Sequence, residues 1–305
     1  MAVLAGASGL PDLPPFTLGR VFSAWELDPF LTVLIVWVAG AYLVGVWLLH
    51  RRGDHWPLGR TLSFVVAGTG GLFFATSSGL GTYDTTLLSV HMAQHMLLTM
   101  VVPLFLALGA PVTLLLRTLP GGPRRVLLAV LHSRLAAVVT FAPLTLLVFV
   151  VSPWALYFTG WYDASLRSTF VHEMTHVHLV LVGSVFLWPL VGADPIPGRV
   201  AYPFRLLLMV LTLPFHAFLG VTIMSQDALI AGDWYRSLPM AWLPDPAADQ
   251  HVAGGILWGS GDLVGLLFFG VLFVQWVRSS MREAEREDRR VDRLEARAAR
   301  SQTSR

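Results

Sequence analysis

Apolar residues form long uninterrupted runs along this chain, separated by short stretches rich in Pro, Gly and Arg. A membrane core about 30 Å thick is crossed by roughly 20 apolar residues of helix. We therefore expect an all-α integral membrane protein built as a bundle of seven transmembrane helices. The predicted spans lie at about 30–49, 61–80, 87–108, 134–158, 168–191, 204–228 and 252–277.

The arginines give this predicted bundle an orientation, because basic residues concentrate in cytoplasmic loops. Eighteen of the 21 basic residues fall after the first, third and fifth spans or in the tail, leaving Arg20, Arg167 and Arg236 on the other side. This distribution predicts an extracytoplasmic N-terminus and a cytoplasmic C-terminus. We expect three parts: an extracytoplasmic leader, a membrane domain, and a charged cytoplasmic tail that forms a solvated helix with pairs of opposite charge. Their bounds are 1–29, 30–277 and 278–305.

The amino-acid composition limits the partners and the metal ligands that this chain can have. Hydrophobic residues make up 55% of the chain and charged residues 13%, and the net charge of +2 gives no reason to expect nucleic acid as a partner. The absence of Cys excludes thiolate metal sites, iron–sulfur clusters and Cys nucleophiles. With ten His in the chain, a metal would be held by imidazole, thioether, carboxylate or backbone oxygen.

Two pairs of histidines have the spacing of metal ligands. His91 and His95 are four residues apart on the third predicted span, and His172 and His176 are four apart on the fifth. Each pair therefore projects from one face of its helix. Two such helices face to face can bind one metal or two, whereas two polar stripes bonded to each other would explain the same pattern without a metal. We predict these four as the primary ligands.

Other polar side chains lie at similar predicted depths. His178 follows His176 by two residues and points the other way, which favours a packing hydrogen bond. His216 and Asp262 fall at about one depth on the last two spans, so we expect them to pair beneath the site. His251 begins the seventh span.

Methionines accompany the first histidine pair. Met92 and Met96 form a stripe beside it. A thioether is a soft ligand that suits Cu(I), although Met in an apolar helix more often fills gaps in the packing. We therefore rank these two residues below the imidazoles.

Several stretches of the chain resemble the seven-helix CtaG family of bacterial cytochrome c oxidase assembly proteins. They occur in order, cover about Tyr83 to Gln275, and are YDTTLLSVHMAQHMLL, SPWALYFT, HEMTHVH with the following FLWPLVGADPIP, LPFHAFLGVTIM, GDWY and DQHVAGGILWGSGD. The resemblance implies a multi-pass protein of the bacterial plasma membrane. Its implied function is assembly of haem–copper oxidase by copper delivery on the outer side of the membrane, without catalysis.

The resemblance also implies which residues and partners matter. His178 matches a family position, in conflict with its predicted packing role, and Asp262 stands where an acidic residue is expected. The implied cargo is copper, with Cu(I) favoured over Cu(II) and zinc as the alternative. Implied partners are lipid, subunits of the oxidase and other copper chaperones. The positions with implied function are His91, His95, His172, His176, His216, Asp249 and Gln250.

Three other functions stay open from the sequence. In a metal-independent scaffold, the histidines would only pack helices. In a haem b cytochrome, one His from each of two facing helices would bind the iron. The HEMTH segment at 172–176 also fits H-E-x-x-H, in which two His bind zinc and Glu173 is the general base of a metalloprotease. A protease would leave His91 and His95 without a role, and the chain has no Asn-Pro-Asp-Gly type of motif.

Overall fold

A computed structural model describes residues 13–197 and 200–303, with side chains described as far as residue 290. The regular elements in this part of the chain are all helical. The first twelve residues of the predicted leader lie outside it. The elements before the fourth predicted span are α1 (Arg20–Ser23), α2 (Pro29–Arg51), α3 (Leu58–Thr61), η1 (Leu62–Thr69), α4 (Gly70–Ser77), α5 (Gly79–Tyr83), α6 (Leu88–Met96), η2 (Leu97–Val101), α7 (Val102–Leu108), α8 (Pro111–Thr118) and α9 (Gly121–Leu131). The rest are α10 (Arg134–Val139), α11 (Ala142–Phe158), α12 (Trp161–Arg167), α13 (Thr169–Val191), α14 (Tyr202–Ser225), α15 (Gly232–Ser237) and α16 (Pro246–Thr303).

Within the described ranges, six helical stretches are long and apolar enough to cross a membrane. They overlap the first, second, third, fifth, sixth and seventh predicted spans. Their bounds are Pro29–Arg51, Leu58–Tyr83, Leu88–Thr118, Thr169–Val191, Tyr202–Ser225 and Pro246–Arg290. Two of them contain π-helical turns, η1 and η2. The second turn ends two residues before Pro103, which has no N–H to give to the carbonyl of Thr99.

The fourth span, predicted at 134–158, ends where α11 ends, at Phe158, but it is not one continuous helix from residue 134. The segment is divided between α10 and the 17-residue α11, and α11 is followed by α12 after a bend of 63°. Pro143 lies in the first turn of α11, where a missing N–H is tolerated but continuation of a preceding helix is not. A seventh span is obtained only if the bent pair of α11 and α12 crosses the membrane as one unit.

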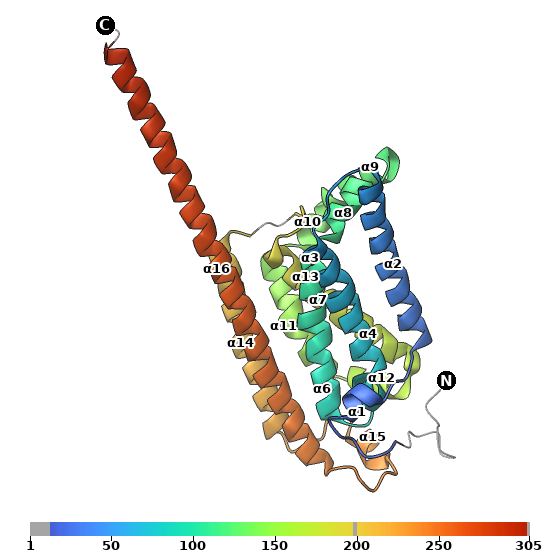
Figure 1. Ribbon diagram of the computed structural model, residues 1–305. Coiled ribbons are helices and arrows are strands. Elements are labelled where there is room, and N and C mark those ends of the chain that lie inside the picture. Colours follow the sequence, from blue (N-terminus) through green and yellow to red (C-terminus); the bar gives the residue numbers. More distant parts are fainter. Residues whose placement is uncertain (1–12, 198–199, 304–305) are drawn as a thin grey trace.

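The bundle has two chemically different ends (Figure 1). The helices α8, α9 and α10 gather at one end, which we call the arginine end, whereas α1, α12 and α15 lie at the other, the histidine end. The helix α16 runs unbroken through the predicted seventh span and tail, and it projects beyond the bundle at the arginine end. Part of the predicted charge pairing is present there, since Arg289 lies 3.8 Å from Glu285 and Arg290 lies 3.4 Å from Glu287.

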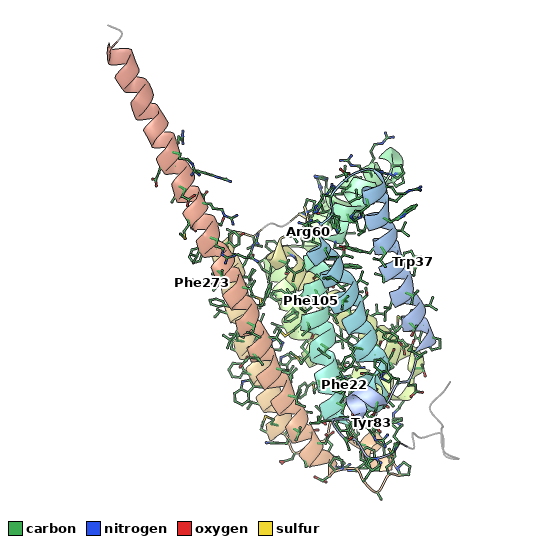
Figure 2. The ribbon with its side chains drawn as sticks, viewed as in Figure 1. Phe22, Trp37, Arg60, Tyr83, Phe105 and Phe273 are labelled. Atoms are coloured by element: carbon green, nitrogen blue, oxygen red, sulfur yellow. The ribbon has the colours of Figure 1, made fainter. Side chains whose placement is uncertain are left out.

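The outer faces of the bundle are apolar. Trp37 on α2 is 69% exposed and Phe273 on α16 is 45% exposed, and the two project from opposite flanks (Figure 2). Large exposed apolar patches are rare on monomeric soluble proteins. A belt of this kind fits a surface in contact with lipid chains.

The two histidine helices approach each other closely at Gly183 of α13. A Cβ placed on Gly183 would collide with the carbonyl oxygen of Thr99 in η2 and with the ring of Pro103 in α7. Small residues at such positions allow membrane helices to pack with their backbones almost in contact. Gly183 thus fixes how closely α13 lies against the helix that carries His91 and His95.

We predict that Gly183→Ala destabilises the protein by about 1–3 kcal/mol, because the added methyl group must push two packed backbones apart. Thermal unfolding of the purified protein in detergent measures the effect. Gly259→Ala on α16 is the matched control, since a Cβ there meets open space and alanine is the better helix former. Equal unfolding temperatures for the two variants would contradict the assigned role of Gly183.

Candidate metal centre

A buried carboxylate and two imidazoles meet at the histidine end. Asp84 follows α5 and is 1% exposed, and His172 and His176 lie one turn apart near the start of α13. The Oδ2 atom of Asp84 lies 3.1 Å from Nε2 of His172 and 3.5 Å from Nε2 of His176. One ligand atom from each of the three lies within 4.8 Å of the others. We call these three residues the Asp84 cluster.

Electrostatics keep Asp84 ionised. Burial by itself would raise the pKa of this carboxyl group, but His172 and then His176 more than reverse that effect. The net result is a pKa well below the usual range of an aspartic acid. A negative charge is therefore held permanently at the centre of the cluster, where a cation would be stabilised.

The orientation of His176 is set from its other side. Its Nε2 atom also lies 3.1 Å from Oε1 of Gln94, whose amide nitrogen donates to the carbonyl of Ala75 at 3.0 Å. Because Nε2 faces two acceptors, the proton of the neutral ring belongs on Nε2. The Nδ1 atom of His176 is buried without a hydrogen-bond partner in the described part of the chain and keeps a free lone pair.

His91 lies beside the cluster and has no hydrogen bond there. It is 1% exposed, and neither of its ring nitrogens has a partner among the described residues. Its ring centroid lies 4.7 Å from that of Tyr162 and 5.9 Å from that of Tyr157. His91 is close enough to the Asp84 cluster to interact with it electrostatically.

Deeper in the bundle, His95 is paired with a tyrosine. The Nδ1 atom of His95 lies 2.5 Å from the hydroxyl oxygen of Tyr157 on α11, and the two rings stack. Tyr162 on α12 and Tyr235 on α15 share a further hydrogen bond of 2.6 Å. Tyr157 and Tyr162 therefore enclose the first histidine pair, and Tyr235 extends this tyrosine enclosure through its hydrogen bond to Tyr162.

Glu173, the acidic residue of the HEMTH segment, is turned toward the start of α2. Its carboxyl group interacts with Asp28, the N-cap residue of α2, and its Oε2 atom is buried without another partner in the described chain. Burial would raise the pKa of Asp28, yet hydrogen bonds from Glu173 and from the backbone N–H groups of Leu31 and Phe30 leave it lowered. The contact with Asp28 ties α13 to α2.

The four predicted primary ligands thus divide into two groups. His172 and His176 meet in the Asp84 cluster, whereas His91 and His95 line the adjoining tyrosine enclosure. The prediction missed Asp84, which lies on no periodic stripe. The one signal for it was its place in the YDTT segment, an acid at the end of an apolar run.

Asp249 and Gln250, which the family resemblance marked as functional, hold backbone in place. Oδ2 of Asp249 accepts hydrogen bonds from the N–H groups of Leu88 and Ser89, and Oδ1 accepts one from the Ser89 hydroxyl. It thereby supplies acceptors to N–H groups that the start of α6 leaves without helical partners. Gln250 accepts from the N–H of Ile230 at 2.8 Å and so fixes the segment before α15.

The remaining candidates lie away from the cluster. His178 shares a hydrogen bond of 2.6 Å with Ser152 and packs against Trp161, as its helical register predicted. His251 is exposed. Met92 and Met96 are buried in the main apolar core.

The expected pairing of His216 with Asp262 is not present in the described part of the chain. His216 instead faces the carbonyl oxygen of Thr212, one turn earlier on α14, at 3.1 Å. Asp262 accepts a hydrogen bond of 2.8 Å from the indole of Trp258, one turn earlier on α16. Equal predicted depth did not imply contact, because each side chain finds a partner on its own helix.

Known proteins similar to this chain share most of its length. It is 38% identical over 289 residues to uncharacterized proteins of Mycobacterium bovis and Mycobacterium tuberculosis, and 37% identical to one of Mycobacterium leprae. Each alignment covers 92% of this chain but 44% of the relative, so the chain spans less than half the length of these curated relatives. No solved structure matches it significantly. The profile of one family, described as cytochrome c oxidase caa3 assembly factor, matches residues 40–279. The chain, as the resemblance predicted, belongs to this CtaG family of cytochrome c oxidase assembly factors.

Proposed function

We propose that this assembly factor binds a copper ion as cargo at the Asp84 cluster and passes it to a nascent haem–copper oxidase. The family supplies the role in oxidase assembly, and the apolar helices fit a multi-pass protein of the plasma membrane. The observation that carries the copper step is the cluster itself, a buried carboxylate with two imidazoles whose ligand atoms lie within 4.8 Å of one another.

The donor chemistry bears on the form of the cargo. Imidazole nitrogen suits copper and zinc, whereas soft thioether ligands select Cu(I). The preference for Cu(I) rested on Met92 and Met96, and both are buried in the apolar core. A carboxylate with two imidazoles instead supports loading as Cu(II), with zinc as the competing ion.

His91, His95 and His216 extend the proposed site inward. The free nitrogens of His91 adjoin the Asp84 cluster, and His95 follows one turn later on α6. His216 contributes to the electrostatic surroundings of His95. Such a series of imidazoles supports transfer by ligand exchange, with an oxidase subunit as the receiving partner and another copper chaperone as the donor.

The histidine end is proposed to face the extracytoplasmic side, with seven crossings and the C-terminus in the cytoplasm. The opposite end carries more arginines, four on α8, α9 and α10 against three on α1, α12 and α15, and α16 takes the arginines of the tail to that end as well. This supports the orientation, because basic residues are retained on the cytoplasmic side.

The same three residues favour a second function, metal-dependent hydrolysis. Two His of an H-E-x-x-H segment with one carboxylate form a set of three protein ligands, the number that catalytic zinc sites use. The contact between Glu173 and Asp28 weighs against it, because a general base must be free to reach the water on the metal.

We predict that the double variant His172→Ala/His176→Ala loses stoichiometric copper, and that Asp84→Asn weakens copper binding about 10–100-fold because it removes the negative charge. Metal analysis and Cu²⁺ titration of the purified proteins measure both effects. His178→Ala, on the same helix but bonded to Ser152, is the control and should bind copper normally. Loss of copper with full oxidase activity would instead establish a metal-independent scaffold, and full copper binding would place the metal at other residues.

The orientation is testable because the chain has no Cys of its own. A membrane-impermeant maleimide added to intact cells should label Asp245→Cys, which lies between α15 and α16, and should label His132→Cys, after α9, only once the membrane is permeabilised. The reverse pattern would place the histidine end in the cytoplasm.

Glu173→Gln separates the two functions. It preserves the size of the side chain but removes the general base, so a copper carrier should keep its metal and its support of oxidase activity. Loss of oxidase activity with unchanged metal content would favour hydrolysis. Metal content and oxidase activity are measured in the same membranes. The control is Glu26→Gln, which makes the same change outside the HEMTH segment.

A further inference from the structure

His91 lacks the partners that its burial calls for. Its side chain is 1% exposed, yet Nδ1 and Nε2 both lack a hydrogen bond within the described chain. Buried polar groups in folded proteins are almost always paired, and each exception needs an explanation. Two free nitrogens on one buried imidazole next to a carboxylate cluster point to a ligand that the ring receives from outside.

The side of His91 away from α6 is closed by tyrosines. The Tyr162 ring lies 4.7 Å from the His91 ring, and the Tyr162 hydroxyl is joined to that of Tyr235 at 2.6 Å. Both tyrosines are buried, and they come from the short helices α12 and α15. One hydrogen bond between two short helices therefore completes this side of the enclosure.

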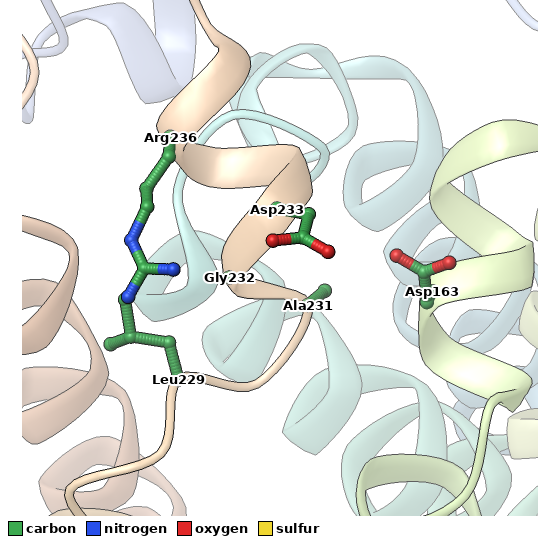
Figure 3. A pocket seen from close by; sticks show the side chains of 6 residues that line it. All are labelled: Asp163, Leu229, Ala231, Gly232, Asp233 and Arg236. Atoms are coloured by element: carbon green, nitrogen blue, oxygen red, sulfur yellow. The ribbon is translucent and has the colours of Figure 1, made fainter.

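A pocket of about 300 Å³ opens on the solvent side of the same two helices (Figure 3). The carboxylate of Asp163 on α12 and that of Asp233 on α15 are turned toward each other across it. Tyr162 directly precedes Asp163, and Tyr235 lies between Asp233 and Arg236, another residue of the lining. Each helix thus presents an acid to the pocket and a tyrosine to the interior.

Each of the two helices begins at an irregular stretch of backbone. The helix α12 follows α11 after a 63° bend at a break that includes Gly160. The N-cap residue of α15, Ala231, has a φ of 50°, a left-handed conformation that is unfavourable for a residue with a Cβ. A rotation at either break would separate the two tyrosine hydroxyls, and it would act against the hydrogen bonds from Trp161 to Thr175 and from Trp234 to the carbonyl of Thr85.

We propose that Tyr162 and Tyr235 form a gate between this pocket and His91, and that His91 is the first imidazole to receive a metal cation entering from the pocket. The Asp163 carboxylate already accepts two hydrogen bonds from Arg167, and Arg236 also lines the pocket, so Asp233 is the acid that meets the cation at the opening. His91 then hands it to the Asp84 cluster, where one ligand atom from each of three side chains lies within 4.8 Å of the others. The identity of the cation as copper rests on the proposed function; the gate itself does not.

Tyr235→Phe tests the gate, because it removes one hydroxyl and keeps the packed ring. The first readout needs no metal: diethylpyrocarbonate modifies accessible neutral imidazoles, and mass spectrometry of the full-length protein in detergent gives the rate at His91. We expect that rate to rise about fivefold, the factor expected for loss of one hydrogen bond from the closed state. Tyr162→Phe should have the same effect.

The second readout is stopped-flow loading with Cu²⁺ alone. Loading and release should both accelerate about fivefold in Tyr235→Phe, with a Kd within twofold of the wild-type value. Tyr83→Phe is the matched control, since Tyr83 is buried at the same end but donates to the carbonyl of Pro14, away from His91. It should change neither readout.

The two readouts keep the gate and the copper function apart. An unchanged rate of His91 modification in both tyrosine variants overturns the gate, even where copper binds normally. A change in Kd as large as the change in rates overturns it as well, because the tyrosines would then be part of the binding site. Faster modification in a protein that binds no Cu²⁺ supports the gate and contradicts the copper function.

Discussion

The buried charge of Asp84 determines how the surrounding helices must pack. An unpaired carboxylate in an apolar interior is very costly, so this one is stable only while imidazoles stay against it. Both imidazoles come from the first turns of α13, and α13 must therefore be held against the segment between α5 and α6. The close contact at Gly183 provides this, since it allows the backbone of α13 to reach that of η2. The stability of the Asp84 charge therefore depends on the close packing of α13.

Long helices form one side of the candidate site, and short helices cover the other side. Long helices hold the Asp84 cluster from below, and Asp249 fixes the start of α6 through three hydrogen bonds. The cover consists of the short helices α12 and α15. The latter is anchored to the segment between α5 and α6 by Trp234, which donates to the carbonyl of Thr85 at 2.7 Å. Local opening is easiest where few apolar contacts must break. This division fits the proposed gate, in which a cation enters past the short helices while the Asp84 cluster stays in place.

Much of the fold and part of the site could be predicted from the sequence. Apolar runs locate most helices because lipid demands continuous helices of fixed length, and the spacing of His172 and His176 places both on one face. Asp84 could not be found in this way, since it lies between helices and has no periodicity. Asp249 shows a second limit: similarity to a family marks a residue as important without showing that it caps a helix. The break before α11 was hidden because an apolar run continues through it.

The absence of Cys fits the proposed role of a copper carrier. Thiolates bind copper so strongly that release depends on a stronger competing ligand, whereas imidazoles and a carboxylate exchange more readily. The arrangement around His176 has the same consequence. Its Nε2 atom is shared between Asp84 and Gln94, and its Nδ1 atom is free, so the ring can bind a cation from one side while it stays oriented from the other. Hydrogen bonds that orient a ligating side chain but leave one of its nitrogens accessible suit a protein that releases its metal better than one that stores it.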